Sequence, residues 1–564
     1  MQVSAGPPTF QEITVAYRAY RIRKVKCDEG RPSCFKCTST GRTCDGYGVW
    51  DGEESANSYV SLTLRGCNIP LQPPPFSALA LNLEEWNRFE FFRRRSSKKI
   101  QGIFFSHFWD TLVFQVSSSE PAVLHALLAL SSVQVAATVD THTYAPNPAT
   151  VIPDKQEEFT LRQYIKAIGH LQPHLSAKHD LSIRVALVAC VVFVCLDFFR
   201  GHNKSAQTHL LSGLKLLADT QNYSGVANEC SNISNPFGDP FNDWIAEAFY
   251  RLHVQVGLFN QGYEFPRIAL RPIVVKPQPL NFHSMRQARN YLDQLIDQII
   301  HLGQLGLQDL DSIFPGMVEC QKSIRAELES WHVAFKTSKI NLLSEMPIRG
   351  EFAYHLLNMY YLMGKVMAHA CIWPTCEGIY DLHGDDFTSI ITIGVNLRKR
   401  TIPATRTLIG EDDGGIIKAI GDIGWIPPLY YTAIKCRIHR IRLQAIRLLN
   451  SAPHKELIWD AKILGAVAQK VMEIEERDFY HDGHESSEMD ITKFPETHHF
   501  SLPTLPILFR IHEVRILLPD EPFGKTVLLC RRKMDDGSWA TTAKEYDILS
   551  QSWVAVGEGV TKGS

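Results

Sequence analysis

The chain has 564 residues, of which 45% are hydrophobic and 21% are charged, as in folded globular proteins and unlike disordered or fibrous ones. This length predicts roughly two to four domains. The net charge of −2 indicates no partner by itself, but the charge is unevenly distributed. Residues 17–44 contain eight basic side chains and two acidic ones, so a basic segment precedes a mildly acidic body. This asymmetry favours a polyanionic partner for the basic segment.

Four cysteines in the basic segment follow the spacing C-x6-C-x2-C-x6-C, namely Cys27, Cys34, Cys37 and Cys44. Zinc requires four ligands in a tetrahedron, and a C-x2-C pair supplies two of them from one tight turn. The first fifteen residues lack the apolar core of a secretory signal, so we expect reduced thiols rather than disulfides. The spacing therefore predicts a zinc site.

The stretch RIRKVKCDEGRPSCFKCTSTGRTCDGY, residues 21–47, resembles the fungal binuclear zinc cluster family of transcription factors, in which six cysteines bind two zinc ions. The resemblance implies a nuclear regulator of RNA polymerase II genes whose partners are double-stranded DNA and the transcription machinery. It places Arg23 and Lys24 at base contacts in the major groove, at CGG-like triplets, and Arg21 and Lys26 at phosphate contacts. A short basic helix can present paired donors to guanine in this way.

The family pattern places its first two cysteines at Tyr17 and Tyr20. A phenol is a poor zinc ligand beside thiolates, and in the family the first cysteine bridges both metals. We therefore expect at most one zinc, bound by Cys34, Cys37 and Cys44 with Cys27 or water as the fourth ligand, and weak DNA binding. Three interpretations stay open: an impaired DNA-binding regulator, a decayed relative acting as a co-regulator through protein contacts, and a wrongly assigned exon before Arg21.

The rest of the chain predicts an all-α fold, with the small zinc-cluster module at residues 17–47 followed by a large, solenoid-like bundle of helices. We expect a disordered N-terminus over residues 1–16, a linker over 48–84, the helical domain over 85–540 and a C-terminal tail over 541–564. Only residues 271–280 read as a strand, at a sheet edge at most because of their prolines. Loops are predicted at 138–155, 220–245 and 478–500.

Segments such as IQGIFFSHFWDTLVFQ and WIPPLYYTAIKCRIHRIRLQAIRLL resemble the helical regulatory domain that accompanies these zinc clusters. The resemblance implies that this domain regulates the DNA-binding module, in some members through a small-molecule effector. Residues 185–196 are strongly apolar, but twelve residues are too few to span a bilayer, which needs about 20. We interpret them as a buried core helix and expect no membrane partner.

Three polar segments could have a function of their own. The bases at 435–447 (Lys435, Arg437, Arg440, Arg442 and Arg447) could contact nucleic acid, but a solvated helix face is favoured. Residues 93–99, RRRSSKK, fit a nuclear import signal and an exposed helix start equally well. The histidines at 481–485 and 497–500 match no zinc-enzyme spacing. Without a nucleophile elbow, a P-loop or a dinucleotide fingerprint, the sequence does not indicate an enzyme.

Overall fold

The computed structural model describes residues 81–561 except 140–154, 178, 231–239, 261–279, 309–314, 345–346, 410–418, 452–453, 478, 481–502, 523 and 535. All described residues belong to the second of two units of the chain, Pro73–Ser564. The predicted zinc-cluster segment, the predicted strand at 271–279 and most of the predicted loops at 138–155 and 478–500 lie outside the described residues.

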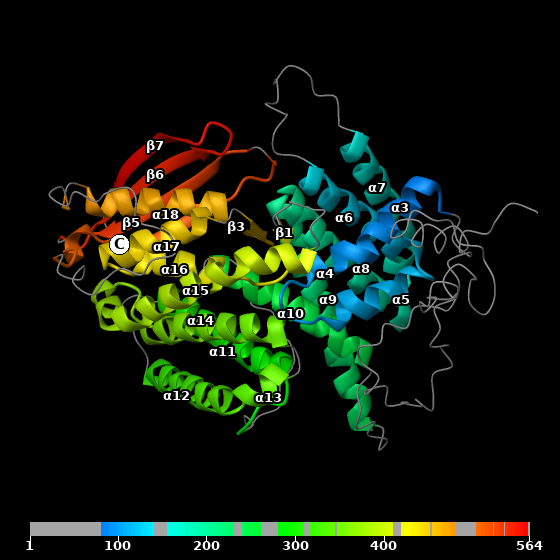
Figure 1. Cartoon of the computed structure of the whole chain (residues 1–564), viewed down its shortest axis with the longest axis horizontal. Coiled ribbons are helices and arrows are strands. Elements are labelled where there is room, and N and C mark those ends of the chain that lie inside the picture. Colours follow the sequence, from blue (N-terminus) through cyan, green and yellow to red (C-terminus); the bar gives the residue numbers. More distant parts are fainter. Residues whose placement is uncertain are drawn as a thin grey trace, which may run out of the picture. The chain divides into compact units, whose positions relative to one another are not determined.

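Helices make up most of the described residues (Figure 1). In chain order they are α3 (Leu83–Phe91), the π-helical η2 (Phe92–Ser96), α4 (Ser97–Ile100), the π-helical η3 (Phe108–Leu112), α5 (Val113–Ser117), α6 (Pro121–Val139), α7 (Lys155–Ser176), α8 (Asp180–Arg200), α9 (Asn203–Cys230), α10 (Pro240–Asn260), α11 (Met285–Gln308), α12 (Pro315–Thr337), α13 (Lys339–Ser344), α14 (Pro347–Ala370), the 3-10 helix η4 (Glu377–His383), α15 (Gly384–Ile409), α16 (Ile426–Lys435), α17 (His439–Ser451), α18 (Ala461–Glu476) and the 3-10 turn η6 (Ile507–Phe509). The predicted loop at 220–245 is shorter than expected, because α9 extends to Cys230 and α10 begins at Pro240.

Helix α8 is the centre of the first group of helices and contacts α6, α7, α9 and α10. Its apolar residues face all directions, and such a helix is stable in water only when other elements surround it. Val188, Val192 and Leu196 are fully buried. Among the described helices, α8 alone is long and apolar enough to cross a membrane, but 72% of its apolar window is buried by the protein. The prediction of a buried core helix is confirmed.

The ends of these helices follow local sequence signals. Asn82 and Glu85 form a reciprocal capping box, in which the Glu85 N–H donates to Asn82 Oδ1 at 2.9 Å and the Asn82 N–H donates to Glu85 Oε2 at 3.2 Å. Helix α8 ends at Arg200 and is capped by Gly201, whose left-handed φ of 86° favours glycine. The backbone of Pro522 lies 3.2 Å from the place where a Cβ of residue 201 would stand, so a larger residue would also be crowded at this turn.

The second group of helices packs in pairs. Helices α11, α12 and α14 contact one another, as do α14 with α15 and α16 with both α17 and α18. Trp331 is fully buried there, stacks on Phe335 with 4.5 Å between the ring centroids, and donates from Nε1 to the Ala288 carbonyl at 2.8 Å. The indole N–H of this buried ring therefore has a hydrogen-bond partner, as stable packing requires.

Two small sheets interrupt the helical pattern. The first joins β1 (Ala419–Ile420) to β2 (Lys455–Glu456) in parallel and β2 to β3 (Trp459–Asp460) antiparallel. The second is an antiparallel sheet in the order β4 (Glu513–Leu517), β5 (Thr526–Lys533), β6 (Trp539–Asp547) and β7 (Ser552–Thr561). It lies against α18 through β5, whose inward residues Leu528 and Cys530 are buried (Figure 1).

The C-terminal sheet corrects the predicted all-α fold, which holds only as a mostly helical fold. Residues 541–547 and 552–561, within the C-terminal tail expected at 541–564, belong to β6 and β7. The strands escaped prediction because β5 reads TVLLCRR, with apolar residues on both faces instead of strict alternation. Both faces of β5 are at least partly covered, so the sequence carries no period of two.

Candidate functional site

The predicted zinc ligands and DNA contacts lie outside the described residues: Arg21, Arg23, Lys24, Lys26, Cys27, Cys34, Cys37 and Cys44. The histidines at 481–485 and 497–500 also lie outside them. Within the part of the chain that the structure describes, no group of three or more histidine, cysteine or acidic side chains could hold a metal ion. The sites described below therefore lie in the second unit of the chain, which contains the helices and the C-terminal sheet.

The prediction of a solvated basic face at 435–447 is wrong for three of its five bases, because Lys435, Arg437 and Arg442 are buried. The sequence pattern suggested one continuous helix. Instead α16 ends at Lys435, Cys436 is extended, and α17 begins at His439. The break directs Arg437 and Arg442 toward the acidic end of α18 rather than toward solvent.

Six buried side chains form a set of ion pairs, here termed the seam network: Glu377, Lys435, Arg437, Arg442, Glu475 and Glu476. Glu377 binds two bases at 2.8 Å, Lys435 Nζ through Oε1 and Arg437 Nη2 through Oε2. Glu475 also binds two, with Oε1 3.0 Å from Arg437 Nη2 and Oε2 2.5 Å from Arg442 Nη2. Each of these two carboxylates therefore neutralises two cations across helix boundaries.

The seam network also holds the segment that leads into the C-terminal sheet. The Ile511 N–H donates to Glu475 Oε1 at 2.6 Å, and Lys435 Nζ donates to the His512 carbonyl at 3.2 Å. Arg510, buried beside them, donates from Nη1 to the Glu377 carbonyl at 3.1 Å. Charged side chains of η4, α16 and α18 thereby fix the backbone at the start of β4.

Burial and charge oppose each other within the network. Burial acts to raise the pKa of Glu475, but Arg437 and Arg442 hold the pKa of that carboxyl below its usual value. Burial likewise acts to lower the pKa of Arg437, while Glu475 and Glu377 raise it above its usual value. These groups stay charged at neutral pH, so removing one partner would leave an uncompensated charge in the interior.

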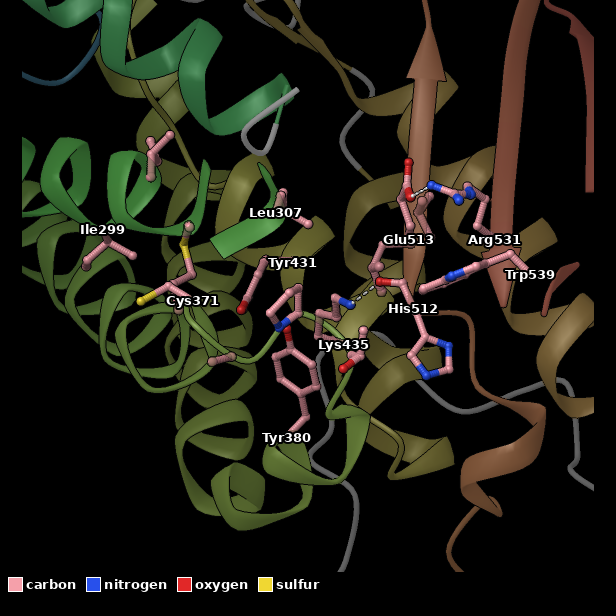
Figure 2. Close-up of a pocket in the computed structure, with 18 residues that line it drawn as sticks. Ile299, Leu307, Cys371, Tyr380, Tyr431, Lys435, His512, Glu513, Arg531 and Trp539 are labelled. Carbon is pink, nitrogen blue, oxygen red and sulfur yellow. Dashed lines mark hydrogen bonds and ion pairs between the residues drawn. The ribbon is translucent and has the colours of Figure 1, made fainter. Parts of the chain in front are cut away.

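A cavity of about 200 Å³ opens beside the network, between the helices and the C-terminal sheet (Figure 2). Its walls come from α11, the end of α14, η4, α16 and strands β4 to β6, and its lining residues are Ile299, Ile300, Gly303, Leu307, Met367, Ala370, Cys371, Pro374, Thr375, Tyr380, Tyr431, Ile434, Lys435, His512, Glu513, Val514, Arg531 and Trp539. Aliphatic side chains come mostly from the helices, whereas charged or aromatic ones come both from the helices (Tyr380, Tyr431 and Lys435) and from the sheet (Glu513, Arg531 and Trp539) (Figure 2).

The polar groups of this seam pocket are neutral or paired. Burial raises the pKa of Cys371 to about 11 and lowers that of His512 below its usual value, so the thiol keeps its proton and the imidazole is uncharged at neutral pH. Burial also raises the pKa of Tyr380, whose hydroxyl interacts with that of Tyr431. Arg531 Nη1 lies 2.9 Å from Glu513 Oε2, which offsets its charge.

A second buried ion cluster was not predicted. Arg289 on α11 binds Asp422 through both terminal nitrogens at 2.6 Å and Asp293 through Nε at 3.1 Å. Its guanidinium also lies 4.4 Å from the centre of the Phe104 ring. The i,i+4 spacing of Arg289 and Asp293 was visible in the sequence, but Asp422 lies 133 residues away along the chain.

Residues 93–99, which fitted an import signal and a helix start equally well, lie in η2 and α4. Arg93 and Arg94 are largely exposed and both pair with Glu90, while Ser96 and Ser97 are buried. The stretch is therefore part of a folded helical turn. Among the described cysteines, Cys195, Cys436 and Cys530 are free thiols and are buried, as expected for apolar contexts.

Comparison with known protein families identifies two domains. Residues 21–49 match the fungal Zn(2)-Cys(6) binuclear cluster domain, which implies zinc as the cofactor. Residues 89–255, from α3 to α10, match the fungal specific transcription factor domain. The first match begins after Tyr20, so it includes neither tyrosine at the positions expected for the first two cysteines. No solved structure matches the chain.

Two curated relatives share part of the sequence. The transcription regulator lscL of Purpureocillium lilacinum is 28% identical over 205 residues, which are 35% of this chain and 48% of the relative. The aspercryptin biosynthesis cluster-specific transcription regulator atnN of Emericella nidulans is 29% identical over 218 residues, 36% of this chain and 34% of the relative. The alignments thus span half or less of each relative. The chain therefore contains the zinc-cluster domain and the helical domain found in fungal transcription regulators that act in the nucleus, and both relatives are transcription regulators rather than enzymes.

Proposed function

We propose that this protein is a zinc-dependent, sequence-specific DNA-binding regulator of genes transcribed by RNA polymerase II. The observation that supports it best is the co-occurrence of a zinc-cluster match at 21–49 and a regulatory-domain match at 89–255. The basic residues at 18–42 supply the sequence-independent attraction to phosphate that such binding needs. Arg23 and Lys24 are the proposed base contacts at CGG-like triplets, and Arg21 and Lys26 the proposed phosphate contacts.

Tyr17 and Tyr20 should weaken both the zinc binding and the DNA binding of this regulator. With thiolates only at Cys27, Cys34, Cys37 and Cys44, we expect at most one zinc per chain. Metal binding supplies about 10–16 kcal/mol of folding free energy to small zinc modules, so an incomplete cluster leaves the basic helix poorly held. We therefore expect the chain as it stands to bind DNA weakly.

The same tyrosines favour one alternative function, a co-regulator that acts through protein contacts of the helical domain and does not bind DNA. In either case the helical domain is the regulatory part. A small-molecule effector is proposed for it, and the transcription machinery is its proposed partner. The relatives are described as transcription regulators, one of them specific to a biosynthesis cluster, which suits a regulator of a limited set of genes.

A gel-shift titration with the full-length protein tests both functions. The Tyr17→Cys/Tyr20→Cys variant should bind a CGG-containing duplex at least about tenfold more tightly than the unmodified chain, with two zincs per chain instead of one or none by elemental analysis. Adding Arg23→Ala and Lys24→Ala to that variant should abolish the preference for CGG over a scrambled duplex. Adding Arg21→Ala should weaken binding to both duplexes and reduce the salt dependence.

Two outcomes would change these conclusions. Nanomolar, sequence-selective binding by the unmodified chain would support the DNA-binding function and refute the expectation that the tyrosines impair the cluster. No DNA binding by the Tyr17→Cys/Tyr20→Cys variant, despite two bound zincs, would favour the co-regulator instead.

A further inference from the structure

We infer that the seam pocket binds a small, uncharged, partly aromatic molecule with a carbonyl group, and that Tyr380 donates the hydrogen bond that orients it. The comparisons assign no ligand to this pocket, which involves α11, α14, α16 and the C-terminal sheet, beyond the matched residues 89–255. Binding of the ligand depends on the pocket alone. Only a regulatory effect of that binding rests on the proposed function.

The size and lining of the pocket set the first limits on the ligand. A cavity of about 200 Å³ corresponds to the liquid volume of roughly seven waters, so it suits a fragment-sized molecule rather than a drug-sized one. Ile299, Leu307 and Met367 contribute aliphatic side chains to its walls, and Tyr431 and Trp539 contribute rings (Figure 2). A ring compound buries the most apolar area in such a space.

The charges around the pocket exclude an ionic ligand. Lys435 is already bound to Glu377 at 2.8 Å and to the His512 carbonyl at 3.2 Å. Arg531 is bound to Glu513 at 2.9 Å, and its guanidinium lies 4.8 Å from the centre of the Trp539 ring. An anion or a cation would have to replace one of these pairs and lose its own hydration, whereas a neutral ligand would not.

The hydroxyl pair supplies the polar group for recognition. Tyr380 and Tyr431 both line the pocket, and their hydroxyls interact with each other. Two hydroxyls carry two protons and can use at most one of them between themselves, so the second proton is left for an acceptor on the ligand. A ketone or amide carbonyl is such an acceptor and carries no charge.

Three isosteric probes test this inference: acetophenone, which is neutral, benzoate, which is an anion, and 1-phenylethylammonium, which is a cation. Saturation-transfer NMR titrations with the full-length protein at pH 7 should show binding of acetophenone, and binding of the two ions at least about tenfold weaker. Equal binding of either ion, or no binding of acetophenone at millimolar concentration, would overturn the inference.

Variants then locate the binding. Gly303→Leu fills the pocket from α11, where a Cβ meets only Cys371 at 3.7 Å, and should abolish acetophenone binding. Gly169→Leu is the matched control, because it makes the same change at an exposed position of α7, where a Cβ meets nothing within 4 Å. Tyr380→Phe should weaken binding about threefold to tenfold, the range for one lost hydrogen bond.

The variants also separate the two proposals. Acetophenone binding that survives Gly303→Leu would place the probe elsewhere and overturn the inference, whatever the DNA-binding result. Conversely, acetophenone binding that is lost in Gly303→Leu, in a protein that fails the gel-shift test above, would support the pocket and count against the proposed function alone.

Discussion

The helices around α8 and the seam beneath the C-terminal sheet are both buried, but different interactions hold them together. Around α8, residues such as Val188 and Leu196 are buried in the hydrophobic core. At the seam, Glu377 and Glu475 each bind two cations in the interior. Apolar burial is non-directional and tolerates rearrangement, whereas buried ion pairs are favourable only in one geometry. The comparison indicates that buried ion pairs position the start of the sheet, whereas apolar packing is the main interaction around α8.

Replacement of Arg442 should cause the largest loss in the free energy of unfolding. Arg442→Met leaves Glu475 and Glu476 without one of their partners, and loss of one partner from a buried ion pair costs about 3–5 kcal/mol. Urea unfolding of the full-length protein would measure this loss. Arg447→Met, a half-buried base on the same helix α17, is the control and should cost under about 1 kcal/mol. Equal losses for the two variants would contradict the assignment.

Truncation of Leu196 tests the other region. Leu196→Ala should cost about 2–5 kcal/mol, because it removes buried methyl groups and leaves a cavity among the helices around α8. Leu181→Ala, on the same helix but 60% exposed, should change the free energy of unfolding far less. The same urea titrations measure both variants. A loss for Leu196→Ala no greater than for the control would mean that this region is not held by packing.

A fall in pH should lower the free energy of unfolding through the seam network but not through the helices around α8. This is the smallest of the three expected effects. The pKa of Glu475 is lowered in the folded protein, so its contribution is fully present above the unfolded value of 4.5. That contribution is lost as pH falls below 4.5 through the lowered folded pKa, by about 1.4 kcal/mol for each unit between the two values. Glu475→Gln should therefore flatten the fall in stability between pH 5 and 3, measured by urea midpoints, while Leu196→Ala should leave its slope unchanged. Glu473→Gln, exposed on α18, is the control, and a slope flattened equally by it would refute the role of Glu475.

Sequence reasoning reached the features that depend on residues close together in the chain. The cysteine spacing led to the zinc-cluster family, and the apolar run of α8 predicted its burial. The seam network could not be predicted because Arg437 and Glu377 lie 60 residues apart, and because the helix break at Cys436 turns the bases inward. The pocket could not be predicted because its lining residues are distant in the sequence, from Ile299 to Trp539.

The link between the α8–α9 corner and the hairpin of β4 and β5 has a consequence for the order of synthesis. Asn203 donates from Nδ2 to the Pro519 carbonyl at 2.7 Å, and the Lys204 N–H donates to Asp520 Oδ1 at 2.9 Å, across more than 300 residues. The ribosome produces the amino-terminal helices long before this hairpin, and Glu475 gains the Ile511 N–H only after both have left the exit tunnel. Nascent chains that stop short of residue 533 should therefore be recognised as incomplete by chaperones and proteases, although all their helices have been made.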